Sequence, residues 1–195
     1  MIVYIHGFNS SSRSQKANVL KEALIDNDYR GEFITPDLSH KPFEAVEELM
    51  FLIKDVDRSE VTLIGSSLGG FYATWLTEKM GVRSILINPA LTPHIGLREY
   101  LGTQTNLHTG EVYKLTETHL IQWEQYYVER LQAIEAYFLM HTMGDELLDW
   151  RLARDRYKGA RQLIIEGGDH GFSEFPDYVN NVLDFADIKI RAKKS

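Results

Sequence analysis

A serine flanked by glycines is the strongest chemical signal in this sequence. Residues Gly65–Gly69 read Gly-Ser-Ser-Leu-Gly, a G-x-S-x-G pattern directly after the apolar run Val61–Ile64 and directly before a helical stretch. A serine nucleophile must stand clear of a sheet on a sharp strand-to-helix turn, and the flanking glycines let the two backbones approach. We therefore expect Ser67 to be a nucleophile at a helix N-terminus, where free N–H groups favour negative charge. The alternative is a turn rich in Ser and Gly that has no chemistry.

Two further side chains would complete the set that an activated serine needs. His170 lies in a glycine-rich segment after the last apolar run and is the expected base. Asp145 follows the preceding apolar run and is the expected acid, which would accept a hydrogen bond from Nδ1 of His170 and stabilise the imidazolium. Glu146 and Asp149 are rivals for that role, although Asp149 is better placed to cap the following helix. The chain order Ser, Asp, His is that of α/β-hydrolases.

An acyl-transfer site also needs two N–H donors aimed at the developing oxyanion. We expect the backbone N–H of Leu68, next after the serine, and that of Phe8, in the loop after the first strand. We expect His6 to hold this loop by hydrogen bonding, not to act as the base. Three more side chains are candidates for contact with the substrate: Asn9, Trp123 and Tyr126. For Trp123 and Tyr126, packing within their own segment is an equal alternative.

Short apolar runs alternate with amphipathic stretches along the chain, and this alternation predicts the fold. Each run ends at or near turn residues, which is typical of strands buried on both faces of a parallel sheet. The runs are Ile2–His6, Glu32–Thr35, Val61–Ile64, Ser84–Asn88, Ala133–His141 and Gln162–Ile165. Helical spacing between them predicts an α/β fold: a mostly parallel, doubly wound sheet of about six strands with helices on both faces.

Residues 91–130 break this alternation, because the segment is far longer than a plain crossover. It begins with Thr92-Pro93, a good helix start, and is rich in aromatic residues. We expect a helical insertion that lies over the carboxyl ends of the strands as a lid. No linker or internal repeat stands out elsewhere, so residues 1–195 are expected to form a single domain.

Composition argues against several other classes of protein. The 195 residues carry a net charge of −7, which disfavours nucleic-acid binding. No apolar run is long enough to span a membrane, and Met1–Ile5 has the character of a first strand, not of a signal peptide. The absence of cysteine excludes disulfides and thiolate metal sites, and the histidine spacing does not match a zinc protease, so no metal is expected. A cytoplasmic location is the expectation consistent with these features.

Taken together, the motifs resemble one family along nearly the whole chain. The chain is similar to the small bacterial YqiA-type esterases of the α/β-hydrolase superfamily. The matching stretches are Tyr4–Ser11, Gly65–Gly70, Tyr72–Leu76, Asn88–Ala90, Gly144–Glu146 and Glu166–His170. The residues expected to be catalytic show no departure from the family pattern.

The resemblance implies a reduced α/β-hydrolase fold that lacks the two leading strands of larger relatives. It also implies hydrolysis of small-molecule acyl esters, with acyl-CoA thioesters among the candidates, and no metal or organic cofactor. The acyl group would pass through an intermediate on Ser67. Two alternatives stay open: an acyltransferase that uses the same site, and a non-catalytic binding protein of the same fold.

Overall fold

The computed structural model describes residues 1–106 and 108–191. Its main sheet consists of six parallel strands in the order β2-β1-β3-β4-β7-β8. The strands are β1 (Ile2–Ile5), β2 (Phe33–Ile34), β3 (Thr62–Ser66), β4 (Arg83–Ile87), β7 (Tyr137–Thr142) and β8 (Arg161–Ile165). The prediction of a doubly wound sheet of about six strands is therefore confirmed.

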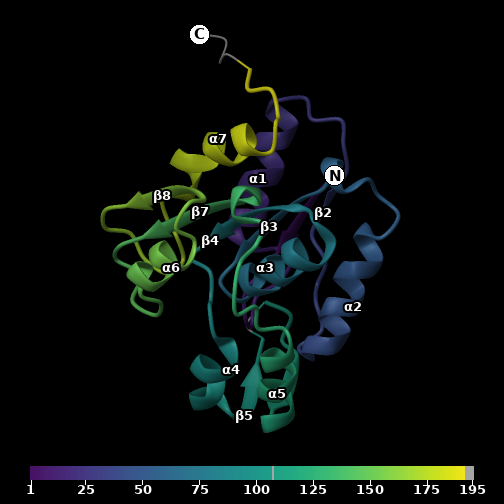
Figure 1. Ribbon diagram of the computed structural model, residues 1–195. Helices are drawn as coiled ribbons and strands as arrows, with labels where there is room; N and C mark the ends of the chain where they lie inside the picture. The colour runs from purple at the N-terminus through teal and green to yellow at the C-terminus, as the bar shows by residue number, and fades with distance from the viewer. Residues whose placement is uncertain (107, 192–195) are drawn as a thin grey trace.

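Helices cover both faces of this sheet (Figure 1). Helices α1 (Gln15–Asp26) and α7 (Phe175–Phe185) pack together on one face. The other face is covered by α2 (Pro42–Ile53), α3 (Leu68–Met80) and α6 (Trp150–Arg156). This arrangement follows from parallel pairing, because each connection between neighbouring parallel strands must cross over one face.

Alternating side chains of the central strands build two separate cores. In β3 and β4, Leu63 and Leu86 face the core beneath α2 and α3, whereas Ile64 and Ile85 face the core beneath α1 and α7. All four side chains are fully buried. Because both faces are covered, these strands appear in the sequence as continuous apolar runs and not as alternating ones.

The segment 91–130 is an insertion of mixed structure: it contains helices, as the expectation of a helical insertion said, and also a pair of strands that the expectation did not include. It contains α4 (Pro93–Gly96), the 3₁₀ turn η2 (Leu97–Tyr100) and α5 (Glu117–Gln125), and also an antiparallel pair of strands, β5 (Gly102–Thr105) and β6 (Val112–Leu115). The pair is short and half exposed, so it lacks the apolar run by which the other strands were found. It is tied to the main domain by Asn106, whose amide donates to the carbonyl of Ser10 at 2.8 Å.

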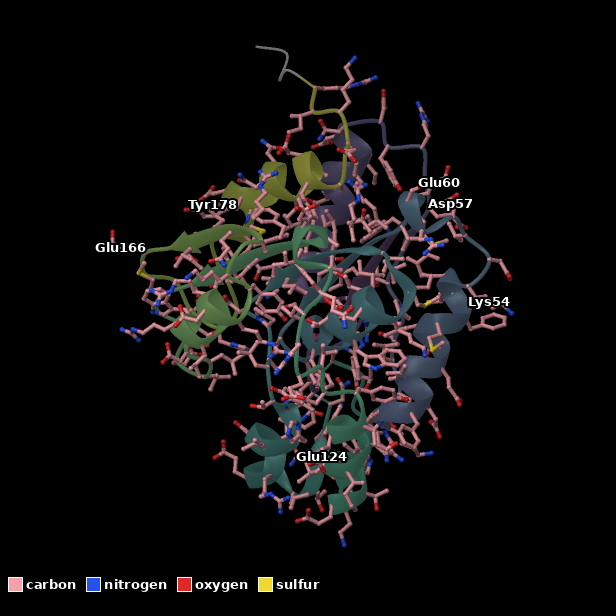
Figure 2. The ribbon with its side chains drawn as sticks, in the orientation of Figure 1. Lys54, Asp57, Glu60, Glu124, Glu166 and Tyr178 are labelled. Atoms are coloured by element: carbon pink, nitrogen blue, oxygen red, sulfur yellow. The ribbon has the colours of Figure 1, made fainter. Side chains whose placement is uncertain are left out.

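The insertion projects away from the α1–α7 side of the molecule. In Figure 2, Glu124 of α5 lies in the lower part of the view, whereas Tyr178 of α7 lies in its upper left part. The insertion packs on the core beneath α2 and α3 through Leu115, Leu120 and Trp123, all buried. Among the described residues, no helix has both the length and the apolar character needed to cross a bilayer.

Candidate active site

Ser67 occupies a strained turn between β3 and α3. Its backbone has φ 53° and ψ −117°, a conformation that residues other than glycine rarely adopt. Hydrogen bonds hold the turn: the Ser67 N–H donates to the carbonyl of Ile87 at 3.0 Å, and its own carbonyl accepts from Ala90 at 2.9 Å. Such strain costs roughly 1–3 kcal/mol and persists only where the surroundings impose it. The turn points the serine side chain out of the sheet, as the sequence pattern predicts.

Gly69, two residues after the serine, is required because the backbone of α3 passes very close to that of β1 at this point. A Cβ at Gly69 would overlap the main-chain carbonyl of Ile5 in the neighbouring strand β1. No rearrangement of a flexible side chain could relieve that overlap, because the obstructing atoms are backbone. The first turn of α3 can therefore lie against the sheet, which brings Ser67 beside the loop after β1.

The structure brings together Ser67, His170 and Asp145, three residues far apart in the sequence. Nε2 of His170 lies 3.0 Å from Oγ of Ser67, and Nδ1 lies 2.8 Å from Oδ2 and 3.0 Å from Oδ1 of Asp145. The Asp145 side chain is completely buried, and that of His170 is 19% exposed. In this geometry Nδ1–H donates to the carboxylate, which leaves Nε2 free to accept the serine proton.

Asp145 is held in its ionised form by hydrogen bonds. Burial, the largest influence on its pKa, acts to raise it, but the hydrogen bond from His170 and those from two backbone N–H groups outweigh burial and lower the pKa of Asp145. The two groups belong to Leu147 and Leu148, and each donates to Oδ1 at 2.9 Å. The carboxylate therefore stays charged beside the imidazole.

The rival acids occupy other positions around the imidazole. The Glu146 carboxylate accepts a hydrogen bond from the backbone N–H of His170 at 3.0 Å, so it contacts the main chain of that residue and not its ring. Asp149 caps α6 by accepting from the N–H of Arg151 at 2.9 Å. Of the three acids, only Asp145 forms a hydrogen bond with the imidazole ring.

The loop after β1 supplies the surroundings expected of an oxyanion hole. Gly7 lies against Ser67, with so little space that an added Cβ would lie 3.1 Å from the serine Cβ. Among the described residues, neither the N–H of Phe8 nor that of Leu68 donates to another protein group. His6 braces the loop: its Nδ1 bonds the carbonyl of Gly7 at 2.9 Å, and its Nε2 accepts from the N–H of Leu38 at 3.2 Å. Burial lowers the pKa of His6, which favours this neutral form.

A cavity of about 610 Å³ opens beside Ser67 and His170. Its lining is mainly apolar and comes from two segments, the start of the insertion and the stretch that follows Asp145. The apolar side chains in its wall are Phe8, Leu68, Pro89, Ala90, Leu91, Pro93, Leu97, Tyr100, Leu147, Leu148 and Leu152. The insertion borders the cavity through residues 91–100, and no described residue of α5 lines it.

The three residues expected to contact substrate do not line this cavity in the described part of the chain. The indole N–H of Trp123 donates to the hydroxyl of Tyr72 at 2.7 Å inside the core. Tyr126 packs edge-on against Trp75. Asn9 joins the loop after β1 to the insertion by accepting from the hydroxyl of Tyr113 at 2.7 Å. These residues build the insertion and its docking on the domain.

Sequence reasoning missed the leucines at 147, 148 and 152. Their signal was their position directly after the expected acid, because the carboxyl ends of parallel strands meet at the same edge of the sheet. A run of apolar residues there must lie near the serine. Only the tertiary structure shows that these leucines line the same cavity as Ser67 and the start of the insertion.

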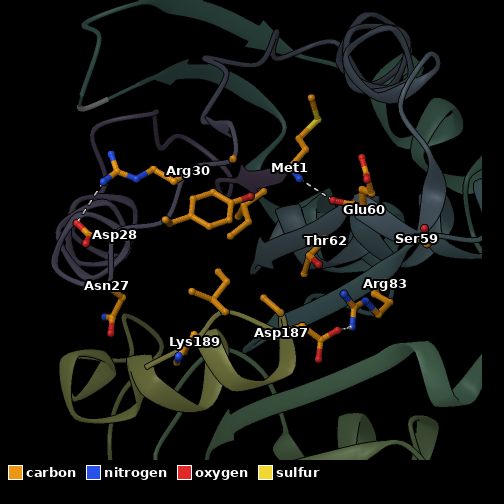
Figure 3. Close-up of a pocket in the computed structure, with 15 residues that line it drawn as sticks. Met1, Asn27, Asp28, Arg30, Ser59, Glu60, Thr62, Arg83, Asp187 and Lys189 are labelled. Atoms are coloured by element: carbon orange, nitrogen blue, oxygen red, sulfur yellow. Dashed lines mark hydrogen bonds and ion pairs between the residues drawn. The ribbon is translucent and has the colours of Figure 1, made fainter. Parts of the chain in front are cut away.

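A second cavity, of about 570 Å³, lies beside the amino ends of β3 and β4, whereas Ser67 lies at the carboxyl ends of the strands (Figure 3). Within it, Arg83 pairs with Asp187 at 2.5 Å, and the amino group of Met1 donates to the backbone carbonyl of Glu60 at 2.6 Å. No histidine lines it in the described residues. It therefore lacks the nucleophile–base pair of the site at Ser67.

Comparison with known proteins gives a match over nearly the whole chain. The family described as "Uncharacterised protein family (UPF0227)" matches residues 1–187. A UPF0227 protein of Shewanella woodyi is 35% identical over 94 residues, which are 48% of this chain and 52% of that relative. The chain thus spans about half the length of the curated relatives it matches.

Several solved structures with a similar backbone are described as hydrolases or esterases. The mouse alpha/beta hydrolase domain-containing protein 10 has a TM-score of 0.70 at 18% identity, covering 94% of this chain and 89% of its own. Est1E from Butyrivibrio proteoclasticus has a TM-score of 0.68 at 16% identity, covering 96% of this chain and 88% of its own. At these identities the similarity shows the α/β-hydrolase fold.

Proposed function

We propose that this chain, which belongs to the UPF0227 family and has the α/β-hydrolase fold, is a serine hydrolase that cleaves carboxylic acyl esters. The observation that carries the proposal is the continuous line of hydrogen bonds from Ser67 Oγ through His170 to the buried Asp145. The strained backbone at Ser67 adds to it, because strain of this kind gathers at functional sites.

The proposed reaction uses each group in turn. Oγ of Ser67 attacks the ester carbonyl carbon while Nε2 of His170 takes the hydroxyl proton, and the carbonyl π electrons move to oxygen. The N–H groups of Phe8 and Leu68 stabilise that oxyanion. The tetrahedral intermediate then collapses, the bond to the alcohol oxygen breaks, and His170 gives its proton to the leaving alcohol. Water attacks the acyl-enzyme by the same route and restores Ser67.

The acyl group is proposed to occupy the cavity beside Ser67. Its wall is mostly leucine, proline and aromatic carbon, so an uncharged apolar acyl group gains the free energy of burial there. Glu99 and Asp149 supply the only carboxylates in the described wall, and they would disfavour an anionic acyl group. The proposed substrate class is therefore an ester with an apolar, uncharged acyl part.

Removal of the nucleophile tests the proposal. We expect Ser67→Ala to lower kcat on p-nitrophenyl esters by ~10⁴-fold or more, because serine, base and acid act as a unit. A fluorophosphonate probe should label the wild-type protein at Ser67 and leave Ser67→Ala unlabelled. The matched control is Ser59→Ala, in the 3₁₀ turn Arg58–Glu60 at the other edge of the sheet. Retention of most activity by Ser67→Ala would exclude the mechanism.

A further inference from the structure

The backbone of the loop that carries His170 is held by side chains from elsewhere in the fold. The amide Nδ2 of Asn88 donates to the carbonyls of Asp169 and His170, each at 3.1 Å. The hydroxyl of Thr142 donates to the same Asp169 carbonyl at 2.9 Å. Glu146 accepts from the N–H of His170 at 3.0 Å. The position of the imidazole is thus set through its main chain as well as by Asp145.

Asn88 is the side chain in this set that also contacts the strand leading to the acid. Its Oδ1 accepts from the N–H of Thr142 at 3.0 Å, and its Nδ2 lies 3.2 Å from the hydroxyl of Thr142. Thr142 is the last residue of β7, and Asp145 follows three residues later. One carboxamide therefore contacts both the strand end that leads to the acid and the loop that carries the base.

The surroundings of Asn88 make this contact specific. The residue is completely buried, and its backbone has a φ of 42° at the end of β4. Asparagine, aspartate and glycine tolerate that conformation better than other residues do. The two loop carbonyls that Asn88 contacts are part-buried, so losing their donor carries a desolvation cost that the loop can relieve by moving to find other partners.

We propose that Asn88 is a positioning residue for the base: its carboxamide fixes the loop of His170 against the end of β7, and so aligns the imidazole with both Ser67 and Asp145. This inference rests on the proposed hydrolase function. Asn88 itself contacts neither Ser67 nor the imidazole ring in the hydrogen bonds of the site. Its contribution is geometric, because misplacing a catalytic group by about 1 Å can cost ~10²-fold in rate.

Two substitutions separate the parts of this role. Asn88→Asp keeps the shape, the tolerated backbone and an acceptor for the N–H of Thr142, but a carboxyl group offers at most one O–H in place of the two N–H donors, so at least one of the two loop carbonyls loses its donor. Asn88→Gly keeps the backbone conformation and removes the whole side chain. We expect both to lower kcat roughly 10- to 100-fold and to leave KM within about twofold, because the lost alignment affects the chemical step.

A spectroscopic signature distinguishes positioning from general loss of stability. The proton that His170 Nδ1 shares with Asp145 should give a far-downfield proton NMR signal, assigned by its loss in Asp145→Asn. We expect this signal to weaken or shift in both Asn88 variants while their circular dichroism stays that of the wild type. The matched control is Asn27→Asp at the end of α1, which loses a donation to the carbonyl of Ala23 far from the site.

Each outcome decides the matter. Folded Asn88 variants that keep wild-type kcat, or that keep the Nδ1 signal unchanged, would overturn the positioning role. If Asn88→Gly does not fold, Asn88→Asp carries the same test, and if neither folds the residue is structural and the proposal fails. A wild-type protein that is neither active nor labelled by fluorophosphonate would remove the proposed function, and the Nδ1 signal would still decide whether Asn88 positions the base.

Discussion

At the scale of the residue, the site depends on a carboxylate that stays ionised although its side chain is buried. Asp145 has no exposed side-chain surface, yet its pKa is lowered, because three donors face its oxygens: Nδ1 of His170 and the N–H groups of Leu147 and Leu148. An ionised buried carboxylate is tolerated only with such partners. Asp145 and Glu146 therefore have different surroundings although they are neighbours in the sequence: Asp145 contacts the imidazole ring of His170, and Glu146 contacts its backbone N–H.

That difference can be measured with two isosteric substitutions. We expect Asp145→Asn to lower kcat by ~10³- to 10⁴-fold, because an amide can hold the imidazole in the wrong tautomer and cannot stabilise the imidazolium. Glu146→Gln keeps an oxygen that accepts from the N–H of His170, so its loss should stay below about tenfold. Steady-state kinetics on one p-nitrophenyl ester checks both. A larger loss in Glu146→Gln than in Asp145→Asn would assign the acid to Glu146.

At the scale of the element, the insertion and the segment 147–152 decide what fits beside Ser67. Their leucines face a common cavity from two sides, and neither segment belongs to the main sheet. Such segments vary without disturbing the strands that position the serine, the acid and the base. If the proposed function holds, the side chains of these segments would select the substrate, whereas the strand ends would position Ser67, Asp145 and His170.

Filling the cavity should change selectivity more than catalysis. We expect Leu97→Trp, in η2, to lower kcat/KM for a p-nitrophenyl octanoate at least about tenfold relative to p-nitrophenyl acetate, since each methylene excluded from an apolar pocket costs ~1–3 kcal/mol. Ile121→Trp on the exposed face of α5 is the matched control and should leave the ratio unchanged. An unchanged ratio in Leu97→Trp would show that the acyl group binds elsewhere.

At the scale of the whole molecule, buried histidines link stability to pH. Burial lowers the pKa of both His6 and His141, whose side chains stay neutral within the fold. In the unfolded chain a histidine titrates near ~6.5, so as the pH falls below that value the unfolded state takes up protons first. The unfolded state then binds more protons than the native state, and stability falls with pH.

Urea unfolding at different pH values tests this linkage. The free energy of unfolding should decrease as the pH falls from ~7.5 to ~5.5, an interval that spans the ordinary histidine pKa of ~6.5 and lies above the range in which carboxylates titrate. His141→Asn removes one buried titrating group and keeps a donor for the carbonyl of Thr142, which Nδ1 of His141 contacts at 3.0 Å. The decrease should be smaller in that variant. A wild-type stability that is constant over this interval would contradict the argument.

Local chemistry allowed much of this protein to be predicted from its sequence. Runs such as Val61–Ile64, closed by turn residues, predicted all six strands of the main sheet. The signal is clearest for the four central strands, because strands buried on both faces are continuously apolar. The glycines around Ser67 predicted the sharp turn, because only a residue without Cβ fits where α3 crosses β1. Because the strands are parallel, the carboxyl ends of β3, β7 and β8 lie at the same end of the sheet, and the segments that follow them carry Ser67, Asp145 and His170.

Contacts between distant segments were decided only by the tertiary structure. The strands β5 and β6 are joined to the loop after β1 by hydrogen bonds to Asn9 and Ser10. Their own residues carry little strand signal. Trp123 lies in the core and not at the cavity, because the insertion folds back onto α3. The choice between Asp145 and Glu146, and the bridging role of Asn88, depend on side-chain directions at the ends of strands. Those directions are fixed by packing across the sheet, which no local pattern of residues contains.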